Sequence, residues 1–322
     1  MYLTDRQTDV REATMRSLRS RTDLFRRFLE QETDVRRLSD VSPTTLHRYK
    51  VYQSERDIAS RTLVSRLSTV AVWLDWLEGM GYVTDGLADH MRAITPQSDT
   101  AREQLLETER ATDILRYLER YEYATRDHVL LLLLWETGIR IGSLRAVDVD
   151  DVEPEETEGC IRVVHRPPRT PLKNGTDGER YVSLRPETIE TIRDYQRHNR
   201  CAQTDTDGRE ALITTPQGRI SIPTVRRTVY HYTRPCAIGK ACPHNRSVEQ
   251  CEATGRSDSW SLCPETVSPH DIRRGALTRM CRSDAPVTAI SDRADVSPDV
   301  LNQHYNQMTE AEKMEQRRDY FR

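Results

Sequence analysis

The sequence predicts a mainly helical protein with one small antiparallel β-sheet, divided into two domains. Two domains are expected because 322 residues exceed the roughly 150 that one domain usually holds. Apolar residues recur at helical spacing along most of the chain. Only two segments, 159–164 and 180–184, have the composition of strands, and they flank one Asn-Gly turn. Few strands among many helices favour this fold class.

Residues 1–95 are predicted to form a helical N-terminal domain. In its clearest helix, Ser60 is the expected N-cap, and Gly79 and Gly81 mark the expected end. Residues 93–100 carry Pro and small polar residues without periodicity, which predicts a linker and a boundary between residues 95 and 96. The apolar stripe of the helix alternates steps of four and three residues. It consists of Leu63, Leu67, Val70, Leu74 and Leu77.

Residues 96–322 are predicted to form a second domain that contains the sheet. Its helices are expected to begin at about Glu107. The two strands are joined by the segment from Leu172 to Glu179, in which Asn174 and Gly175 favour a chain reversal. Later helices are predicted at residues 186–198, 223–233, 270–281 and 297–305.

The charge of the chain leaves nucleic acid open as a partner. The formal net charge is −3 and the pI about 6.3, whereas DNA-binding domains often have a pI above roughly 9. However, only four of the 48 basic residues are lysines. Arginine dominates, and its planar guanidinium binds phosphate through paired hydrogen bonds. A basic face combined with an acidic remainder would give the same total charge.

Neither a membrane span nor a signal segment is predicted. The longest apolar run, 129–135, is far shorter than the roughly 20 residues that a spanning helix needs. The chain does not open on the charged and then apolar pattern of a signal peptide. A cytoplasmic location is therefore expected.

Five residues of the second domain form a pattern that suits phosphoryl transfer. Arg140 follows an apolar helix in the turn Thr-Gly-Ile-Arg, and Lys173 lies in the predicted hairpin. His270 and Arg273 are expected on one face of a later helix. Tyr305 follows near the end of the chain.

This order resembles the tyrosine recombinase family, which includes the phage integrases, Cre and the Xer recombinases. The family pattern is an arginine in a TGxR turn, a hairpin lysine, an HxxR box and a late tyrosine. The resemblance covers residues 107–305, and the N-terminal helices resemble the family's core-binding domain. It implies a two-domain clamp around double-stranded DNA, made of a helical core-binding domain and a catalytic domain. It also implies site-specific recombination through a 3′-phosphotyrosyl intermediate on Tyr305.

The chemistry of these residue types agrees with the resemblance. Attack on a phosphodiester places negative charge on two non-bridging oxygens, which Arg140 and Arg273 are suited to stabilise. His270 would be a further hydrogen-bond donor or proton carrier. The phenol of Tyr305 forms a stable but reversible phosphoester. Lys173 is suited to protonate the leaving 5′-oxygen, because arginine holds its proton too tightly. This chemistry needs no metal.

Two positions depart from the family pattern. The family usually has an acidic residue three positions after the first arginine, where this chain has Ser143. It also usually has a His or Trp nine or ten residues before the tyrosine, where Asp295 is the nearest polar residue. An ionised aspartate cannot donate a hydrogen bond to phosphate. Three alternatives follow: Asp295 orients another residue, His304 or Arg293 compensates, or activity is reduced.

A cysteine-rich insertion is predicted at about residues 235–264. Four of the seven cysteines lie in this stretch, which in a cytoplasmic protein favours metal binding over disulfides. Four thiolates suit a structural, tetrahedral zinc site. A site that includes His244, or free thiols, are the alternatives. The insertion resembles that of some archaeal integrases. The predicted ligands are Cys236, Cys242, Cys251 and Cys263.

Two other functions share much of this evidence. One is a DNA-binding regulator or accessory protein on the same fold that no longer cleaves, suggested by Ser143 and the missing His or Trp. The other is a relaxing activity like that of type IB topoisomerases. The expected assembly is a monomer in solution that forms a tetramer on two DNA sites. The tail 309–322 is predicted to begin a helix at the capping box of Thr309 and Glu312 and to pack on a neighbouring copy.

Overall fold

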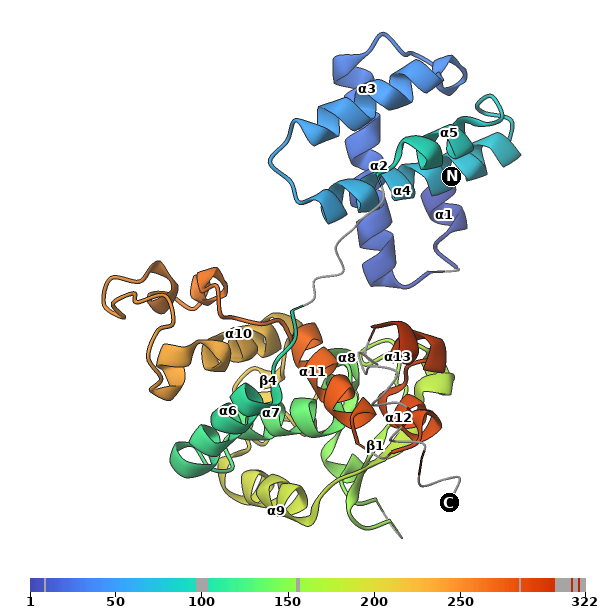
Figure 1. The fold of residues 1–322 in the computed structure, drawn as a ribbon. Coiled ribbons are helices and arrows are strands. Elements are labelled where there is room, and N and C mark those ends of the chain that lie inside the picture. The colour runs from blue at the N-terminus through green and yellow to red at the C-terminus, as the bar shows by residue number, and fades with distance from the viewer. Residues whose placement is uncertain are drawn as a thin grey trace. The chain divides into compact units, whose positions relative to one another are not determined.

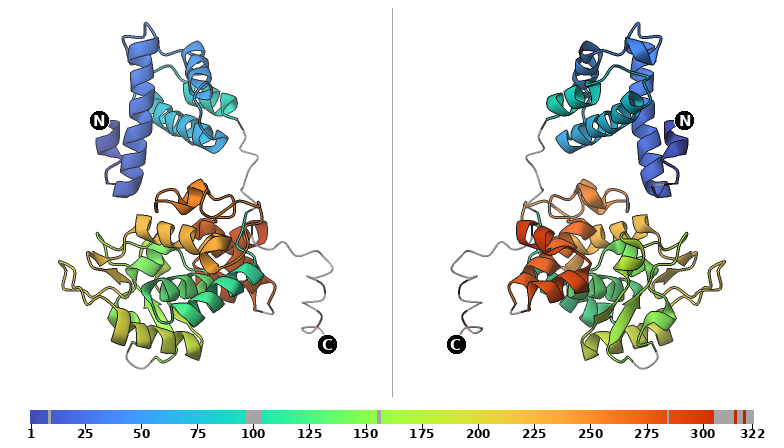
Figure 2. Two further views of the ribbon diagram at one scale, coloured as in Figure 1. Left: turned by 90° about the vertical axis from the view of Figure 1, so that its left-hand side faces the viewer. Right: turned by 90° about the vertical axis from the view of Figure 1, so that its right-hand side faces the viewer.

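The chain divides into two compact units, Met1–Glu103 and Gln104–Arg322. The computed structural model describes residues 1–8, 10–96, 104–154, 157–283 and 285–304, together with Met314 and Arg318. Figures 1 and 2 show both units as ribbons. The sequence placed the boundary between residues 95 and 96, whereas the division lies between Glu103 and Gln104.

The first unit is helical throughout the residues described. Its core is the apolar face of α4 packed against α2 and α5, and Leu67, Val70, Leu74 and Leu77 of the predicted stripe are all buried. Leu63 is partly buried at the edge of this core. The helices are α1 (Tyr2–Asp5), α2 (Glu12–Glu32), η1 (Leu38–Asp40), α3 (Pro43–Ser54), α4 (Ser60–Gly79) and α5 (Leu87–Ile94).

The start of α4 differs from its prediction by one residue. Ala59 occupies the N-cap position and Ser60 is the first helical residue, so the predicted Ser60 N-cap is wrong. The predicted end is confirmed, because α4 stops at Gly79 and Gly81 has a φ of +69°, in the left-handed region that favours glycine.

The second unit combines further helices with two two-stranded antiparallel sheets, so the predicted fold class is confirmed. Its elements are α6 (Thr108–Tyr121), α7 (Arg126–Thr137), α8 (Ile141–Ala146), η2 (Val149–Asp151), β1 (Cys160–Val163), η3 (Gly175–Gly178), β2 (Arg180–Ser183), α9 (Pro186–Asp194), η4 (Tyr195–Asn199), β3 (Thr214–Thr215), β4 (Gly218–Arg219), α10 (Ile222–Thr233), η5 (Pro235–Ile238), η6 (Glu252–Thr254), η7 (Trp260–Leu262), α11 (Pro269–Cys281), α12 (Val287–Ala294) and α13 (Pro298–His304).

Helix α7 is the centre of this unit. All of its residues from His128 to Thr137 are buried, and α6, α9 and α11 pack against it. Its run of leucines is therefore a core helix, apolar on every side because it is enclosed on every side. Among the residues described, no helix is long and apolar enough to cross a membrane.

The predicted hairpin is present as β1 and β2. The strands pair antiparallel with Cys160 opposite Ser183 and Val163 opposite Arg180. Three short elements were not predicted: the hairpin of β3 and β4, helix α8 and helix α12. Each is too short for an apolar period to become visible in the sequence.

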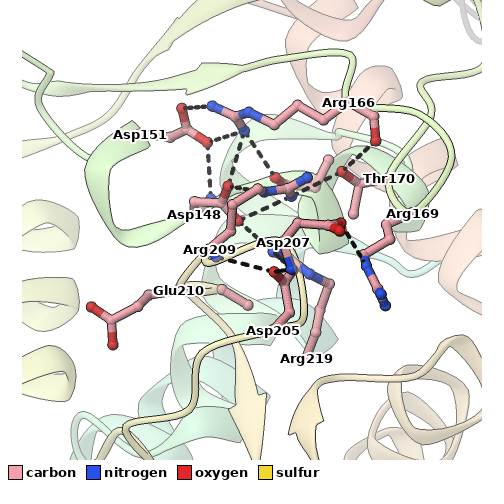
Figure 3. A network of polar contacts seen from close by, with 12 residues as sticks. Asp148, Asp151, Arg166, Arg169, Thr170, Asp205, Asp207, Arg209, Glu210 and Arg219 are labelled. Atoms are coloured by element: carbon pink, nitrogen blue, oxygen red, sulfur yellow. Dashed lines mark hydrogen bonds and ion pairs between the residues drawn. The ribbon is translucent and has the colours of Figure 1, made fainter.

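An ion network ties the segment after α8 to the strands and loops around it (Figure 3). Asp151 is fully buried, and each of its carboxylate oxygens accepts a 2.7 Å hydrogen bond from Arg166. Asp148 accepts from Arg209 Nε at 2.8 Å and from Arg219 Nη2 at 2.6 Å. Each buried carboxylate of the network contacts at least one guanidinium group, so its charge is paired. The network fixes the chain that leaves α8.

Candidate active site

The turn after α7 places Arg140 at the surface of the second unit. Gly138 ends α7 with a φ of +61°. A Cβ at Gly138 would lie 3.4 Å from the side chain of Leu277 on α11, an ordinary contact distance, so the left-handed backbone is the reason that favours glycine here. Arg140 follows as the N-cap of α8, and its side chain is 24% exposed. The turn thus presents the guanidinium while its backbone is fixed by α11.

Helix α11 supplies the second arginine from its buried face. Ser268 caps the helix, and its side chain and that of Asp271 form a capping box. Arg273 is 4% exposed, and its Nη1 donates to the carbonyls of Gly138 and Ala294, both at 2.8 Å. Arg273 therefore joins the turn of Arg140 to the end of α12. His270, in the first turn of α11, is exposed.

Asp295 lies where these elements meet. It follows the last residue of α12 in a left-handed conformation with a φ of +53°. Its carboxylate accepts a hydrogen bond from Arg140 Nη1 and another, of 2.6 Å, from Asn174 Nδ2. Asn174 directly follows Lys173, so the predicted lysine hairpin is anchored beside Arg140.

A further arginine, Arg180 of β2, ties the hairpin to α12. Its Nε donates to the carbonyl of Arg293 and its Nη1 to that of Gly178, at 2.8 and 2.7 Å. Its Nη2 is buried and has no hydrogen-bond partner among the residues that the structure describes. Burial is the main cause that lowers the pKa of Arg180, while Asp295 opposes this shift and Arg140 and Arg293 add to it.

Positive charge exceeds negative charge at this junction. Arg140, Arg180 and Arg273 each donate a hydrogen bond to one of residues 293–295 at the end of α12. The carboxylate that lies beside these three arginines is that of Asp295. Burial also lowers the pKa of Arg293, so the surroundings are poor in water. A cluster of poorly hydrated cations favours a bound anion such as a phosphodiester.

Of the five predicted catalytic residues, the structure brings Arg140, Arg273 and the hairpin of Lys173 together at one place. His270 lies three residues before Arg273 on the same helix, as the expected shared face requires, but His270 is exposed whereas Arg273 is buried. Tyr305 lies outside the described residues, directly after α13.

The family model for the phage integrase family matches residues 104–312, well over half of the chain. The chain belongs to the phage integrase family. The integrase is similar to the tyrosine recombinase XerC of Mycobacterium sp. (strain JLS), at 23% identity over 95% of this chain and 90% of the relative.

Solved integrase structures share the fold. A Tn1549 transposon integrase in complex with transposon right end DNA superposes with a TM-score of 0.71 at 13% identity, covering 99% of this chain and 96% of that one. A lambda integrase dimer bound to a COC′ core site gives a TM-score of 0.62 at 14% identity, covering 95% and 93%. The family and the XerC relatives together support a site-specific recombinase of the tyrosine class.

Two residues of the integrase site were not singled out from the sequence for their contacts. Asn174 was interpreted only as part of a turn, and Arg180 only as the start of a strand. Their partners lie more than a hundred positions away, at Asp295 and Arg293. No local sequence pattern indicates a contact over such a distance. Asp295 itself was singled out from the sequence, because it departs from the family pattern. Ser143, the other departure, is buried in α8.

The four cysteines of the predicted zinc site line one small cavity of the integrase, between η5, η6 and η7. Its volume is about 20 Å³, enough for one water-sized particle. Burial raises the pKa of the Cys263 thiol, and the nearby Cys236 and Cys251 add to the rise. However, no three His, Cys, Asp or Glu side chains among the described residues form a ready-made metal site. His244 instead pairs with Glu265 at 3.0 Å.

Proposed function

We propose that this integrase cuts and rejoins duplex DNA through a covalent 3′-phosphotyrosyl link to Tyr305. The observation that carries the proposal is the convergence of Arg140, Arg273 and the Lys173 hairpin at the end of α12. Helix α13 begins four residues after Ala294 at this junction and ends at His304, and Tyr305 is the next residue in the sequence.

In the proposed reaction, the Tyr305 oxygen attacks the scissile phosphorus and the bond from phosphorus to the 5′-oxygen breaks. Arg140 and Arg273 stabilise the charge on the non-bridging oxygens. Lys173 gives its proton to the leaving 5′-oxygen, and His270 is a further donor or proton carrier. Attack by a 5′-hydroxyl on the phosphotyrosine reverses the step, joins the strands and releases Tyr305. Each step exchanges one phosphoester for another, so no external energy source is needed.

The experiment that tests this proposal uses a suicide substrate, in which a nick lets the short 5′-strand diffuse away after cleavage. The wild-type protein should form a covalent adduct that resists denaturation, and Tyr305→Phe should bind the same DNA without forming one. A regulator that no longer cleaves is the second candidate, favoured by Ser143 and Asp295. It would bind DNA and give no adduct with the wild-type protein.

The lysine has its own test. Lys173→Ala should lose cleavage on ordinary DNA and regain it on a substrate whose leaving group is a 5′-thiol, because a thiolate leaves without a proton. Absence of rescue would contradict the role of Lys173 as general acid. Lys240, which pairs with Asp113 on the surface of α6, is the matched control position.

We further propose that the integrase acts as an assembly. It would be a monomer in solution and a tetramer on two DNA sites, with residues 309–322 packing on a neighbouring copy. This tail lies outside the described residues, apart from Met314 and Arg318.

Deleting residues 309–322 should leave binding to one site intact and abolish the synaptic complex. Adducts without a synaptic complex in the full-length protein would instead indicate a topoisomerase-like relaxing activity. We also propose a cytoplasmic location.

A structural zinc ion in the cysteine cavity is also proposed. The four thiol donors that line the cavity and the size of the cavity suit one Zn²⁺ ion held by Cys236, Cys242, Cys251 and Cys263. The ion would stabilise a segment that otherwise has short 3-10 turns and little apolar core. Elemental analysis of purified protein should give one zinc per chain. Cys251→Ser should remove the zinc and lower the melting temperature, whereas Cys201→Ser should do neither.

A further inference from the structure

The carboxylate of Asp295 connects two elements that carry candidate catalytic residues. One oxygen accepts from Arg140, in the turn after α7, and the other accepts from Asn174, in the hairpin of Lys173. The Asp295 side chain is only 10% exposed, so little water competes for these hydrogen bonds. A single side chain thus links the turn to the hairpin.

The backbone beside Asp295 receives two more arginines. The Ala294 carbonyl accepts from Arg273 and the Arg293 carbonyl from Arg180, each at 2.8 Å. Three consecutive residues at the end of α12 therefore contact α11, β2, the hairpin and the turn of Arg140. A displacement at this point would move the cations of the site relative to one another.

We propose that Asp295 is a positioning residue that sets Arg140 and the Lys173 hairpin in register before the phosphate binds. This inference rests on the proposed strand cleavage. A guanidinium has five N–H donors, so Arg140 retains donors for a phosphate while Nη1 is held by Asp295. Lys173 is exposed, and the Asn174 contact restricts the loop that carries it. Asp295 thus has a role different from the phosphate donor that the family usually places near this position.

The backbone conformation of Asp295 allows two substitutions that add no backbone strain. Its φ of +53° suits glycine and asparagine better than other residues. Asp295→Gly removes the carboxylate without adding backbone strain. Asp295→Asn keeps an acceptor for Arg140, and its amide can pair with the carbonyl oxygen of Asn174 once that side chain turns over. Asp292→Asn, at an exposed position of the same helix, is the control.

The test combines cleavage with an independent measure of order in the hairpin. At saturating DNA, Asp295→Gly should form adduct about 10²-fold more slowly than the wild-type protein, as expected for catalytic groups that are misplaced by about 1 Å. Asp295→Asn and Asp292→Asn should stay close to the wild-type rate. Amide hydrogen exchange over residues 172–178 should be faster in Asp295→Gly alone.

Two results would overturn the inference. One is wild-type cleavage and unchanged hairpin exchange in Asp295→Gly. The other is a rate for Asp295→Asn as low as that for Asp295→Gly, because charge and not position would then decide the rate. If the wild-type protein forms no adduct, the proposed cleavage fails instead. The exchange measurement still reports on Asp295 in that case, so the two failures are distinguishable.

Discussion

The second unit contains two groups of aspartate and arginine side chains that form the same kind of ion pair but differ in their charge. In the network around Asp148 and Asp151, carboxylates and guanidinium groups alternate (Figure 3). At the end of α12, several arginines surround Asp295. In the first group, four arginines pair with three aspartates, so the charges nearly cancel and the group holds the chain in place. The second has positive charge in excess, which a phosphate would neutralise.

Exposure alone does not separate the two groups. Asp151 is completely buried, but its partner Arg166 has a side chain that is 23% exposed, nearly the same as Arg140 at 24%. What differs is the pairing with carboxylates: Arg166 contacts both Asp148 and Asp151, whereas the ion pair of Arg140 among the described residues is with Asp295. The comparison teaches that the ratio of carboxylates to arginines, more than residue type or exposure, separates a structural ion cluster from a candidate phosphate site.

The largest expected effect is on the stability of the structural network. Asp151→Asn removes the charge that pairs Arg166 and leaves buried donors without a carboxylate. The free energy of unfolding should fall by about 3 kcal/mol, the usual cost of breaking a buried ion pair. Urea unfolding measures this change. The control is Asp207→Asn, because Asp207 pairs with Arg169 at the surface and should contribute at most about 1 kcal/mol. Equal effects of the two substitutions would contradict the comparison.

Substitution of Arg140, a proposed catalytic residue, should act on the cleavage rate instead. Arg140→Ala should lower the rate of adduct formation by about 10² to 10³, the usual effect of removing one donor to a transition-state oxyanion. The free energy of unfolding should change little, since the guanidinium is partly exposed. Single-turnover cleavage together with urea unfolding separates the two quantities. If Arg140→Ala lowers the free energy of unfolding as much as Asp151→Asn does, Arg140 has a structural role. Arg273 is a poorer probe, because it also holds two buried carbonyls.

A buried histidine, His128, gives a third and smaller effect. Burial lowers the pKa of His128 to about 4, and its Nδ1 accepts from the Ala124 amide, which requires the neutral ring. The folded pKa lies below the unfolded value, so the stabilisation is complete above about pH 6.5 and is lost as the pH falls. The free energy of unfolding should be about 2 kcal/mol lower at pH 5 than at pH 7 on this account. His128→Gln should remove that part of the pH dependence. An unchanged profile would place the titrating group elsewhere.

The smallest effect concerns salt. The logarithm of the DNA-binding constant should fall with the logarithm of salt concentration, with a slope of about −0.9 for each phosphate neutralised. Arg140→Ala should make the slope shallower by about 1, because one phosphate contact is lost. Asp207→Asn should leave the slope unchanged. An unchanged slope in Arg140→Ala would show that Arg140 does not contact a DNA phosphate.

The sequence predicts the helical units, the β1–β2 hairpin and the turn of Arg140 because each depends on local signals. Helical periodicity, an Asn-Gly turn and a glycine after an apolar run all act over a few residues. The Asp148 network could not be found in this way. Its members extend from Asp148 to Arg219, and charged residues in a sequence usually indicate a solvated surface. Only the fold makes them neighbours.

The candidate site was predictable as far as a family pattern reaches. Arg140, Lys173 and Arg273 follow the pattern, and the structure gathers their elements at one junction. The role of Asp295 was open among three alternatives, and its contact to Arg140 favours the first, that it orients another residue. The exposure of His270 was not predictable, because helical spacing gives the angle between two side chains and not the packing around them.

The most direct test of the central claim is the identity of the residue linked to DNA. The adduct trapped on a suicide substrate can be digested with protease and nuclease and its modified peptide sequenced by mass spectrometry. The proposal predicts a nucleotide on the peptide that contains Tyr305, with Arg140→Ala reducing its yield. A nucleotide on Tyr230 or Tyr320, or no adduct with wild-type protein that binds the DNA, would contradict it.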